Sequence, residues 1–253
     1  MKQRDDAILL IDEPALHLHP NKIRSLARKL ISFSKSQVII ITHSPYFVNT
    51  EVFGSDKSLI CVSRIEQKTC VKSAIDGFTL SIKSYLFKPE VFFCKCNLLV
   101  EGASDAASIS AISEYFDKIF VRFDVILVDL GGKDNLSSYI PLFQMYELSH
   151  VAMVDKDYLC EKRNQTSDFI VLAGRLEDEL KLLDPELEVQ DSRISGECKK
   201  SNSSIRADSA YKIVTAKMKT SDGRNLIRST DLGKVFDSVL SKLGLDPETV
   251  WKI

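Results

Sequence analysis

Short apolar runs alternate with amphipathic segments along this chain. Near the amino terminus, an apolar run at 7–11 precedes a segment at 21–33 whose apolar residues recur at helical spacing. A β-branched run at 37–42 follows. A strand, a helix and a second strand in this order predict a parallel βαβ unit.

The longer carboxyl-terminal part repeats this alternation. Its apolar runs suit buried strands and lie at 97–100, 124–129, 150–154 and 169–173. Its amphipathic segments predict helices at 106–116, 135–146, 210–218 and 235–243. Ser104 is the expected N-cap of the first of these helices. Strands that alternate with helices predict an α/β fold built on a parallel sheet.

The segment between the two parts predicts only local structure. Residues 58–72 favour a hairpin-like pair of strands with a charged turn. Residues 80–90 predict a helix that ends at Pro89. Farther along, residues 195–208 are rich in serine and basic side chains, which predicts a mobile loop.

Acidic residues follow the apolar runs where strands are predicted to end. Glu101 and Asp105 follow one such run, and Asp155 and Asp157 follow another. The carboxyl ends of parallel strands share one rim of a sheet, where α/β folds bind ligands. Carboxylates gathered there raise one another's pKa unless a cation lies between them. Oxygen ligands without nearby histidine or cysteine favour Mg²⁺ or Mn²⁺. The alternative is a set of surface acids that cap helices and loops.

Three motifs carry a family resemblance. LLVEGxSD, GGKDN and VDKD occur in this order and resemble the motifs of the Toprim domain, the metal-binding fold shared by topoisomerases, primases and a set of nucleases. The resemblance covers 92–175. It implies that Glu101 and Asp155 are the central metal ligands and that Asp105 and Asp157 complete the shells.

The first apolar run also ends in acids, Asp12 and Glu13. This is a Walker B pattern, in which the aspartate helps to hold Mg²⁺ and the glutamate polarises the attacking water. The motifs DEPxLHLHP and THSPYF resemble the carboxyl half of an ABC-type ATPase head, as in OLD-family (overcoming lysogenization defect) nucleases and RecF-like repair ATPases. The resemblance covers 8–48 and places His43 on the switch histidine that contacts the γ-phosphate. The alternative for a lone histidine at a strand end is a structural role.

The chain contains no Walker A motif, G-x-x-x-x-G-K-[ST]. Without it nothing cradles nucleotide phosphates, so we expect ATP to bind only if another chain supplies a P-loop. The chain is then a truncated product, a fragment, or a protein whose Walker B strand serves only as scaffold. The fusion of this ATPase tail to a Toprim domain singles out the OLD family.

Composition narrows the class of protein. The 253 residues are 44% hydrophobic, which supplies a core for one large or two small domains. No apolar stretch approaches the roughly 20 residues of a membrane span. The charged amino terminus predicts no signal peptide, so we expect an intracellular, cytoplasmic protein, nuclear if the host is a eukaryote. The six cysteines lack metal-ligand spacing and predict reduced thiols.

Charge is distributed unevenly, although the formal net charge is -1. Residues 129–191 hold six Lys/Arg against fourteen Asp/Glu, whereas residues 193–228 hold nine against three. An acidic centre followed by a basic segment suits metal ions beside a phosphate backbone, with Lys199, Lys200 and Arg206 as the expected DNA contacts. The alternative is a solvated basic loop without a partner.

The sequence leaves alternatives open for two roles, the basic residue at the scissile phosphate and the function of Glu177. The OLD resemblance implies a lysine that neutralises the scissile phosphate. Lys200, Arg206 and Lys212 are the basic candidates, and Lys212 stands with Glu101 and Asp155 in the predicted catalytic set. Glu177 follows the last apolar run, where it either joins the metal shell or stabilises the amino terminus of a helix.

The sequence therefore divides into a partial ABC-type ATPase domain at 1–90, a Toprim domain at 91–192, and a basic loop with a helical extension at 193–253. It predicts a DNA endonuclease that hydrolyses phosphodiesters with two Mg²⁺ or Mn²⁺ ions about 4 Å apart. A homodimer, or a partner that supplies the missing ATPase half, is the expected assembly. The alternatives are an inactive regulatory or dimerisation fragment and, less favoured, a topoisomerase or primase.

Overall fold

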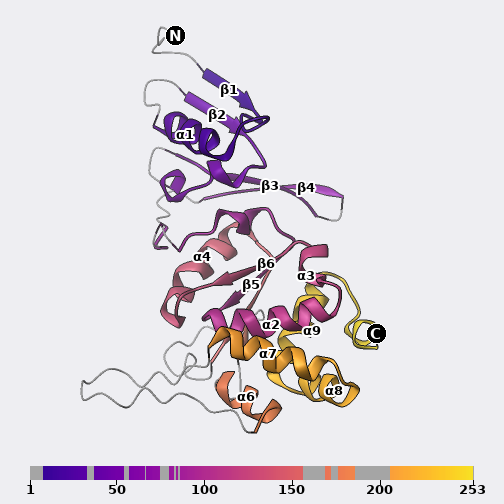
Figure 1. Cartoon of the computed structure of the whole chain (residues 1–253). Helices are drawn as coiled ribbons and strands as arrows, with labels where there is room; N and C mark the ends of the chain where they lie inside the picture. The colour runs from indigo at the N-terminus through magenta and orange to yellow at the C-terminus, as the bar shows by residue number, and fades with distance from the viewer. Residues whose placement is uncertain are drawn as a thin grey trace, which may run out of the picture. The chain divides into compact units, whose positions relative to one another are not determined.

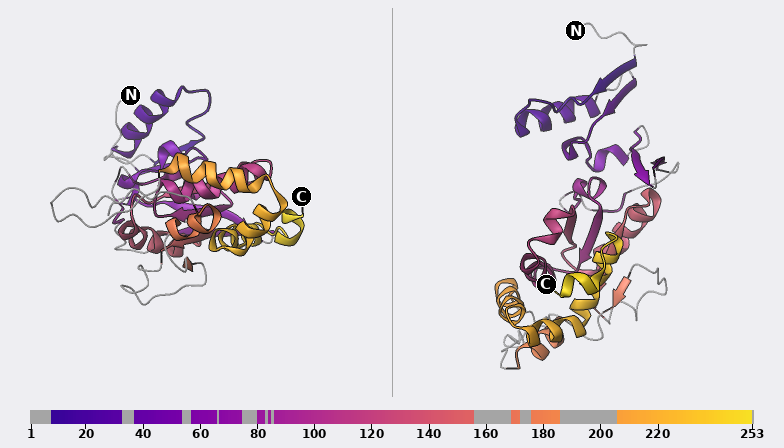
Figure 2. Two further views of the ribbon diagram at one scale, coloured as in Figure 1. Left: turned by 60° about the horizontal axis from the view of Figure 1, so that its bottom comes forward. Right: turned by 90° about the vertical axis from the view of Figure 1, so that its right-hand side faces the viewer.

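A computed structural model describes most of the chain. The described residues are 8–32, 37–53, 57–65, 67–74, 80–82, 84, 86–155, 169–171, 176–185 and 206–252. They form two compact units, whose elements are shown in Figure 1 and Figure 2. The first unit runs to Phe93 and includes Ser138–Glu147, and the second consists of Cys94–Ser137 and the chain from Leu148 onward.

The first unit begins with the predicted βαβ arrangement. Strands β1 (Ile8–Asp12) and β2 (Gln37–Ile41) pair in parallel, and helix α1 (Pro20–Ile31) connects them. Buried Ile23 and Ala27 of α1 pack with Phe47, which lies in the 3-10 helix η1 (Pro45–Phe47). The helix thus covers one face of the pair, and the prediction is confirmed.

The other face of this strand pair is exposed. Ile8 and Leu10 of β1 are 65% and 71% exposed, and Ile41 of β2 is 62% exposed. Alternate residues of a strand point to opposite faces, so these three side chains share the face that α1 leaves uncovered. Among the described residues no element buries this apolar surface.

The rest of the first unit is an antiparallel hairpin and an aromatic cluster. Strands β3 (Ile60–Ile65) and β4 (Lys68–Ser73) form the predicted hairpin. The Tyr146 hydroxyl of helix α4 (Leu136–Tyr146) donates to the carbonyl of Leu59 over 3.1 Å. Phe53, at the end of the 3-10 helix η2 (Thr50–Phe53), lies 5.8 Å from Phe87 and 6.4 Å from Tyr146, ring centre to ring centre.

The predicted helix at 80–90 is wrong. The described residues of this stretch contain no α-helix, and Pro89 instead begins a 3-10 helix, η3 (Pro89–Phe92). Proline suits the first helical position because its fixed φ is already helical, whereas the preceding residue is driven towards extended backbone. Lys88 has φ −110° and ψ 100°, as this rule requires. The apolar spacing reflects burial of Phe87 in the aromatic cluster.

The second unit is built on the predicted parallel sheet. The strands are β5 (Cys96–Val100), β6 (Val125–Asp129), β7 (His150–Val154) and β8 (Phe169–Val171). They lie in the order β6-β5-β7-β8, with every neighbouring pair parallel. All residues of β5 and β7 are buried, as expected for central strands of a covered sheet.

Helices cover this sheet and fill its core. The helices of the second unit are α2 (Ala103–Tyr115), α3 (Ile119–Arg122), α6 (Leu176–Leu183), α7 (Ala207–Met218), α8 (Ser221–Ser229), α9 (Asp231–Lys242) and α10 (Pro247–Trp251). Helices α2 and α9 pack on the strands and on each other, and α7 packs along α2 (Figure 1). Fully buried Phe236 of α9 stacks on Phe116 at 5.5 Å and lies 5.6 Å from Trp251. The helices predicted at 106–116, 210–218 and 235–243 are confirmed, and the carboxyl-terminal helices share one core with the sheet.

No helix in the described parts of the chain combines the length and the apolar character needed to cross a bilayer.

Candidate functional site

The carboxyl ends of three neighbouring strands form the rim that carries the predicted metal ligands. In the sheet register, Val100 of β5 lies opposite Asp129 of β6, and Leu99 lies opposite Ala152 of β7. Glu101 follows β5 directly and Asp155 follows β7 directly. Chain direction therefore places these two acids side by side, although they are far apart in the sequence.

Glu101 is held from both sides. Its backbone carbonyl accepts the N–H of Gly132 over 2.8 Å, from the segment that follows β6. Its carboxylate oxygen Oε1 accepts the N–H of Asp155 over 3.0 Å, from the end of β7. Both Glu101 and Asp155 are partly buried. The Gly132 contact thus holds the backbone of Glu101, and the Asp155 contact holds its carboxylate.

The turn after β6 explains the Gly-Gly pair. Gly131 and Gly132 have φ of 65° and 126°, values that residues with a Cβ rarely adopt. Asp129 accepts the Gly131 N–H over 2.8 Å, and the Asn135 side-chain amide donates to the Leu130 carbonyl over 2.8 Å. The GGKDN motif therefore shapes the loop that brings Gly132 to Glu101.

Asp105 has a structural contact at the start of α2. Its Oδ2 accepts the N–H of Gly102 over 2.9 Å, and Gly102 is the N-cap of the helix. The expectation that Ser104 is the N-cap is therefore wrong, because the reach of Asp105 back to Gly102 starts the helix earlier. The metal-binding role of Asp105 stays a prediction.

The structure gives little or no information on the side chains of several other predicted site residues. Asp157, Lys199 and Lys200 lie outside the described residues. Glu177 lies in the first turn of α6, as the helix-terminus alternative expects, and its side chain is also outside the described residues. Within the described chain no group of three or more His, Cys, Asp or Glu side chains is placed to hold a metal ion.

The basic candidates that are described lie on or beside α7. Lys212 is exposed on this helix. Arg206 precedes the helix and forms an exposed ion pair with Asp208, with 3.2 Å between Nε and Oδ1. Neither contact nor burial fixes these two side chains firmly.

The two described acids of the rim, Glu101 and Asp155, offer ligand atoms that suit a hard divalent cation. Glu101 and Asp155 supply carboxylate oxygens at adjacent strand ends, the ligand type that Mg²⁺ and Mn²⁺ favour.

The predicted ATP-related residues form a second, separate cluster in the first unit. Glu13 follows β1 in a left-handed backbone conformation with φ 45°. Its Oε1 lies 2.6 Å from His43 Nδ1 and accepts the His43 N–H over 3.1 Å. The His43 side-chain hydrogen bond is the main cause that lowers the pKa of Glu13. Asp12 ends β1 and is exposed.

We expect no ATP hydrolysis by the isolated chain. Asp12, Glu13 and His43 supply acids and an imidazole, but the sequence has no Walker A motif to hold the phosphates. Phosphate release from ATP measures this directly. Turnover that disappears in the Glu13→Gln variant would contradict the expectation.

Two family profiles match the chain. One is described as an AAA domain, putative AbiEii toxin, Type IV TA system, and matches residues 2–49. The other is described as an Overcoming lysogenization defect protein-like TOPRIM domain and matches residues 92–157. The second match includes the predicted metal ligands Glu101, Asp105, Asp155 and Asp157.

Two curated relatives match part of this chain. The OLD nuclease of Thermus scotoductus is 27% identical over 164 residues, which cover 59% of this chain and 30% of the relative. The Old nuclease of Escherichia phage P2 is 28% identical over 174 residues, which cover 62% of this chain and 29% of the relative. The chain thus matches under a third of the length of these relatives.

Solved structures give a looser likeness. The C-terminal region of the Burkholderia pseudomallei OLD protein is 16% identical, with 62% of this chain and 91% of that chain covered and a TM-score of 0.29. The C-terminal region of the Xanthomonas campestris pv. campestris OLD protein is 15% identical, with coverage of 64% and 96% and a TM-score of 0.31.

Fold and motifs agree on an α/β domain of the Toprim class, and residues 92–157 match the OLD-like type of this domain. Together with the AAA-domain match at residues 2–49 and the nuclease relatives, this confirms the resemblance to the OLD family seen in the sequence.

Proposed function

We propose that this protein is a metal-dependent DNA endonuclease of the Toprim class. The observation that supports this proposal best is the pair of acids at the sheet rim, with the Glu101 carboxylate bonded to the backbone N–H of Asp155 over 3.0 Å. The names of the relatives, both nucleases, point to the same chemistry. The matches span under a third of each relative.

Each acid has a distinct task in this proposal. Glu101, whose carboxylate accepts the Asp155 N–H, presents an oxygen at a set position and needs little reorganisation during the reaction. Asp155 and Asp157 add oxygens from the end of β7, and Asp105 adds one from the first turn of α2. When bound, Mg²⁺ or Mn²⁺ supplies Lewis-acid polarisation of the phosphodiester and activation of a water. A basic side chain, Lys212, Lys200 or Arg206, neutralises the scissile phosphate.

Plasmid cleavage tests the proposal. Supercoiled DNA incubated with the full chain should be nicked or linearised in Mg²⁺ or Mn²⁺ and should stay intact in EDTA. An inactive regulatory or dimerisation fragment would leave the plasmid intact under all three conditions. A topoisomerase would instead relax the plasmid without leaving broken strands.

The ATPase segment is proposed to work with a further part of an ATPase head. The uncovered apolar face with Ile8, Leu10 and Ile41 is the surface that such a part would cover. The Glu13–His43 contact lies at the ends of the same two strands. A P-loop supplied by this further part, from the same protein or from a partner chain, would complete a site for ATP and Mg²⁺.

The basic segment should contribute to DNA affinity through phosphate contacts. Replacing Lys199, Lys200 and Arg206 together with alanine should flatten the dependence of log K on log salt by about 0.9 per lost contact. Fluorescence anisotropy with a duplex across a salt series measures this slope. An unchanged slope would show that the segment is a solvated loop.

A further inference from the structure

A cavity in the first unit has features of a ligand site. Neither the proposed metal site nor the ATP-related residues use it. It measures about 430 Å³, within the usual range for small-molecule pockets. Its walls come from α1, from η1 and η2, and from the stretch that leads into η3. Asp12, Glu13 and His43 do not line it, and every lining residue belongs to the first unit.

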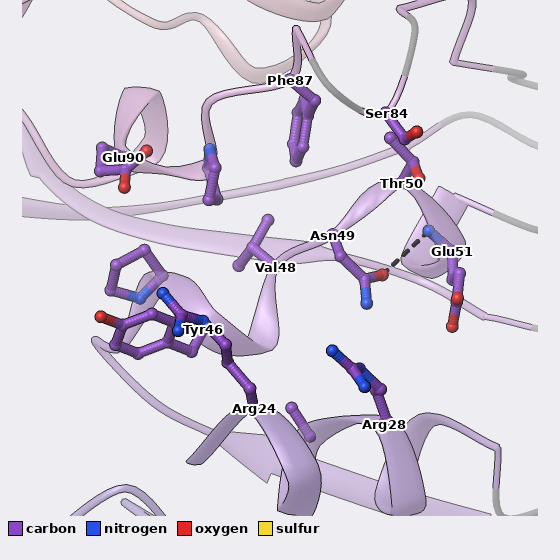
Figure 3. A pocket seen from close by; sticks show the side chains of 13 residues that line it. Arg24, Arg28, Tyr46, Val48, Asn49, Thr50, Glu51, Ser84, Phe87 and Glu90 are labelled. Carbon is purple, nitrogen blue, oxygen red and sulfur yellow. Dashed lines mark hydrogen bonds between the residues drawn. The ribbon is translucent and has the colours of Figure 1, made fainter. Parts of the chain in front are cut away.

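One wall of the cavity carries two arginines. Arg24 and Arg28 are one helical turn apart on α1, and residues at this spacing share a face of a helix. Figure 3 shows Arg24 beside Tyr46 and Arg28 facing the side of the cavity that holds Asn49. Both arginines are exposed, so their guanidinium groups are open to a ligand from solvent.

The two guanidinium groups are held in different ways. The Arg24 guanidinium lies over the Tyr46 ring, 4.9 Å from its centre, and donates to Asn21 Oδ1 over 3.3 Å. These contacts orient its planar fork. Arg28 forms no side-chain hydrogen bond or ion pair with the described residues. A guanidinium fork matches the oxygens of a phosphate group, and two on one wall suit a phosphate ester.

The rest of the cavity lining mixes apolar and polar side chains. Val48 and Phe87 are 5% and 9% exposed and form an apolar wall of the cavity. Glu51 and Glu90 also line the cavity, so it carries as many carboxylates as guanidinium groups. The carboxylates balance the two positive charges, so net charge alone does not draw an anion to this lining. A ligand with an anionic group at one end and hydrogen-bond donors at the other can bind the arginines and the glutamates at once.

We propose that this cavity binds a single nucleotide, with its phosphate on Arg24 and Arg28, its base on the Val48–Phe87 wall, and base amino groups donating to the glutamates. The nucleotide is either free or an unpaired unit of a DNA strand, since the two share this chemistry. Base stacking on aromatic side chains and arginine contacts to phosphate are the usual means by which proteins bind single strands. The site is independent of the metal rim, because it uses residues of the first unit alone.

The test is equilibrium binding to the full chain in EDTA and low salt, with dAMP and a short fluorescein-labelled adenine-rich oligonucleotide as probes. The double variant Arg24→Ala/Arg28→Ala should lose at least about tenfold in affinity, the amount expected for lost hydrogen bonds to charged groups. The matched control is Lys22→Ala/Lys29→Ala, which removes the same charge from exposed positions of α1 that do not line the cavity. The variant Arg24→Lys/Arg28→Lys keeps the charge and should still lose affinity, because an ammonium cannot replace the fork.

The outcomes separate the sources of the nucleotide. Tighter binding of the oligonucleotide than of dAMP, lost in the arginine variant, assigns the site to a DNA strand, and equal binding assigns it to the free nucleotide. The proposal is overturned if neither probe binds, if the arginine and lysine variants bind alike, or if inorganic phosphate competes as well as dAMP. Binding is measured in EDTA and therefore does not depend on the metal site. A variant of Glu101 or Asp155 that no longer cleaves DNA but still binds the nucleotide probes would contradict the nuclease site and not this proposal.

Discussion

The Asp155→Ala variant is expected to lose cleavage of supercoiled plasmid almost completely. The substitution removes a predicted metal ligand but keeps the backbone N–H that holds the Glu101 carboxylate. The loss should exceed the roughly 10–100-fold that follows from removing an outer-shell partner of a metal site. Glu101→Gln should have a similar effect, since an amide oxygen can still accept the Asp155 N–H but carries no charge for a cation.

The matched control for both variants is Asp117→Asn. Asp117 lies in the same unit, beyond the end of α2, with a side chain that is 88% exposed and an ion pair to Arg122. Its φ of 55° is one that asparagine tolerates well, so the backbone should not change. Melting curves in EDTA should coincide for all these variants and the wild type. Full cleavage by Asp155→Ala would refute the Toprim assignment of function.

The Phe236→Ala variant should lower the free energy of unfolding more than any of the other proposed variants. Phe236 is fully buried in the second unit, where it stacks on Phe116 and meets Trp251 edge to face. Removing a buried phenylalanine side chain costs about 3–5 kcal/mol, from lost burial and from the cavity left behind. Urea unfolding is the measurement, followed by the fluorescence of Trp251, which is the one tryptophan in the chain.

The control for this variant is Val121→Ala. Val121 lies in α3 of the same unit but is 74% exposed, so its truncation should change the free energy of unfolding by less than about 0.5 kcal/mol. Equal unfolding midpoints for the two variants would mean that α9 does not share a core with the sheet.

The main strands and several helices were predictable because burial imposes a regular pattern. The central strands are apolar at every position, and α7 and α9 have apolar residues at helical spacing. Helices α8 and α10 were missed because they are short or polar. Their caps were a signal in the sequence, since Thr220 accepts the Gly223 N–H over 3.1 Å and Asp246 accepts the N–H groups of the first turn of α10.

The site was predictable only in part. Parallel strands that end in acids predict a shared rim, and the structure places Glu101 beside Asp155. The contact between Asp105 and Gly102 depends on side-chain direction, which spacing alone does not reveal. The arginine cavity was missed because its walls come from segments that the sequence separates, from Arg24 to Glu90.

Calorimetric titration with Mn²⁺ tests the central claim most directly, because it measures metal binding without relying on catalysis. The wild-type chain should bind Mn²⁺, and the variants Asp155→Ala and Glu101→Gln should lose most of the binding heat while Asp117→Asn retains it. Metal that binds only the native state should also raise the melting temperature of the wild type, with about 2.7 kcal/mol of added stability at a hundredfold excess over Kd. No binding by the wild type, or equal binding by all four proteins, would contradict the claim that Glu101 and Asp155 form a metal centre.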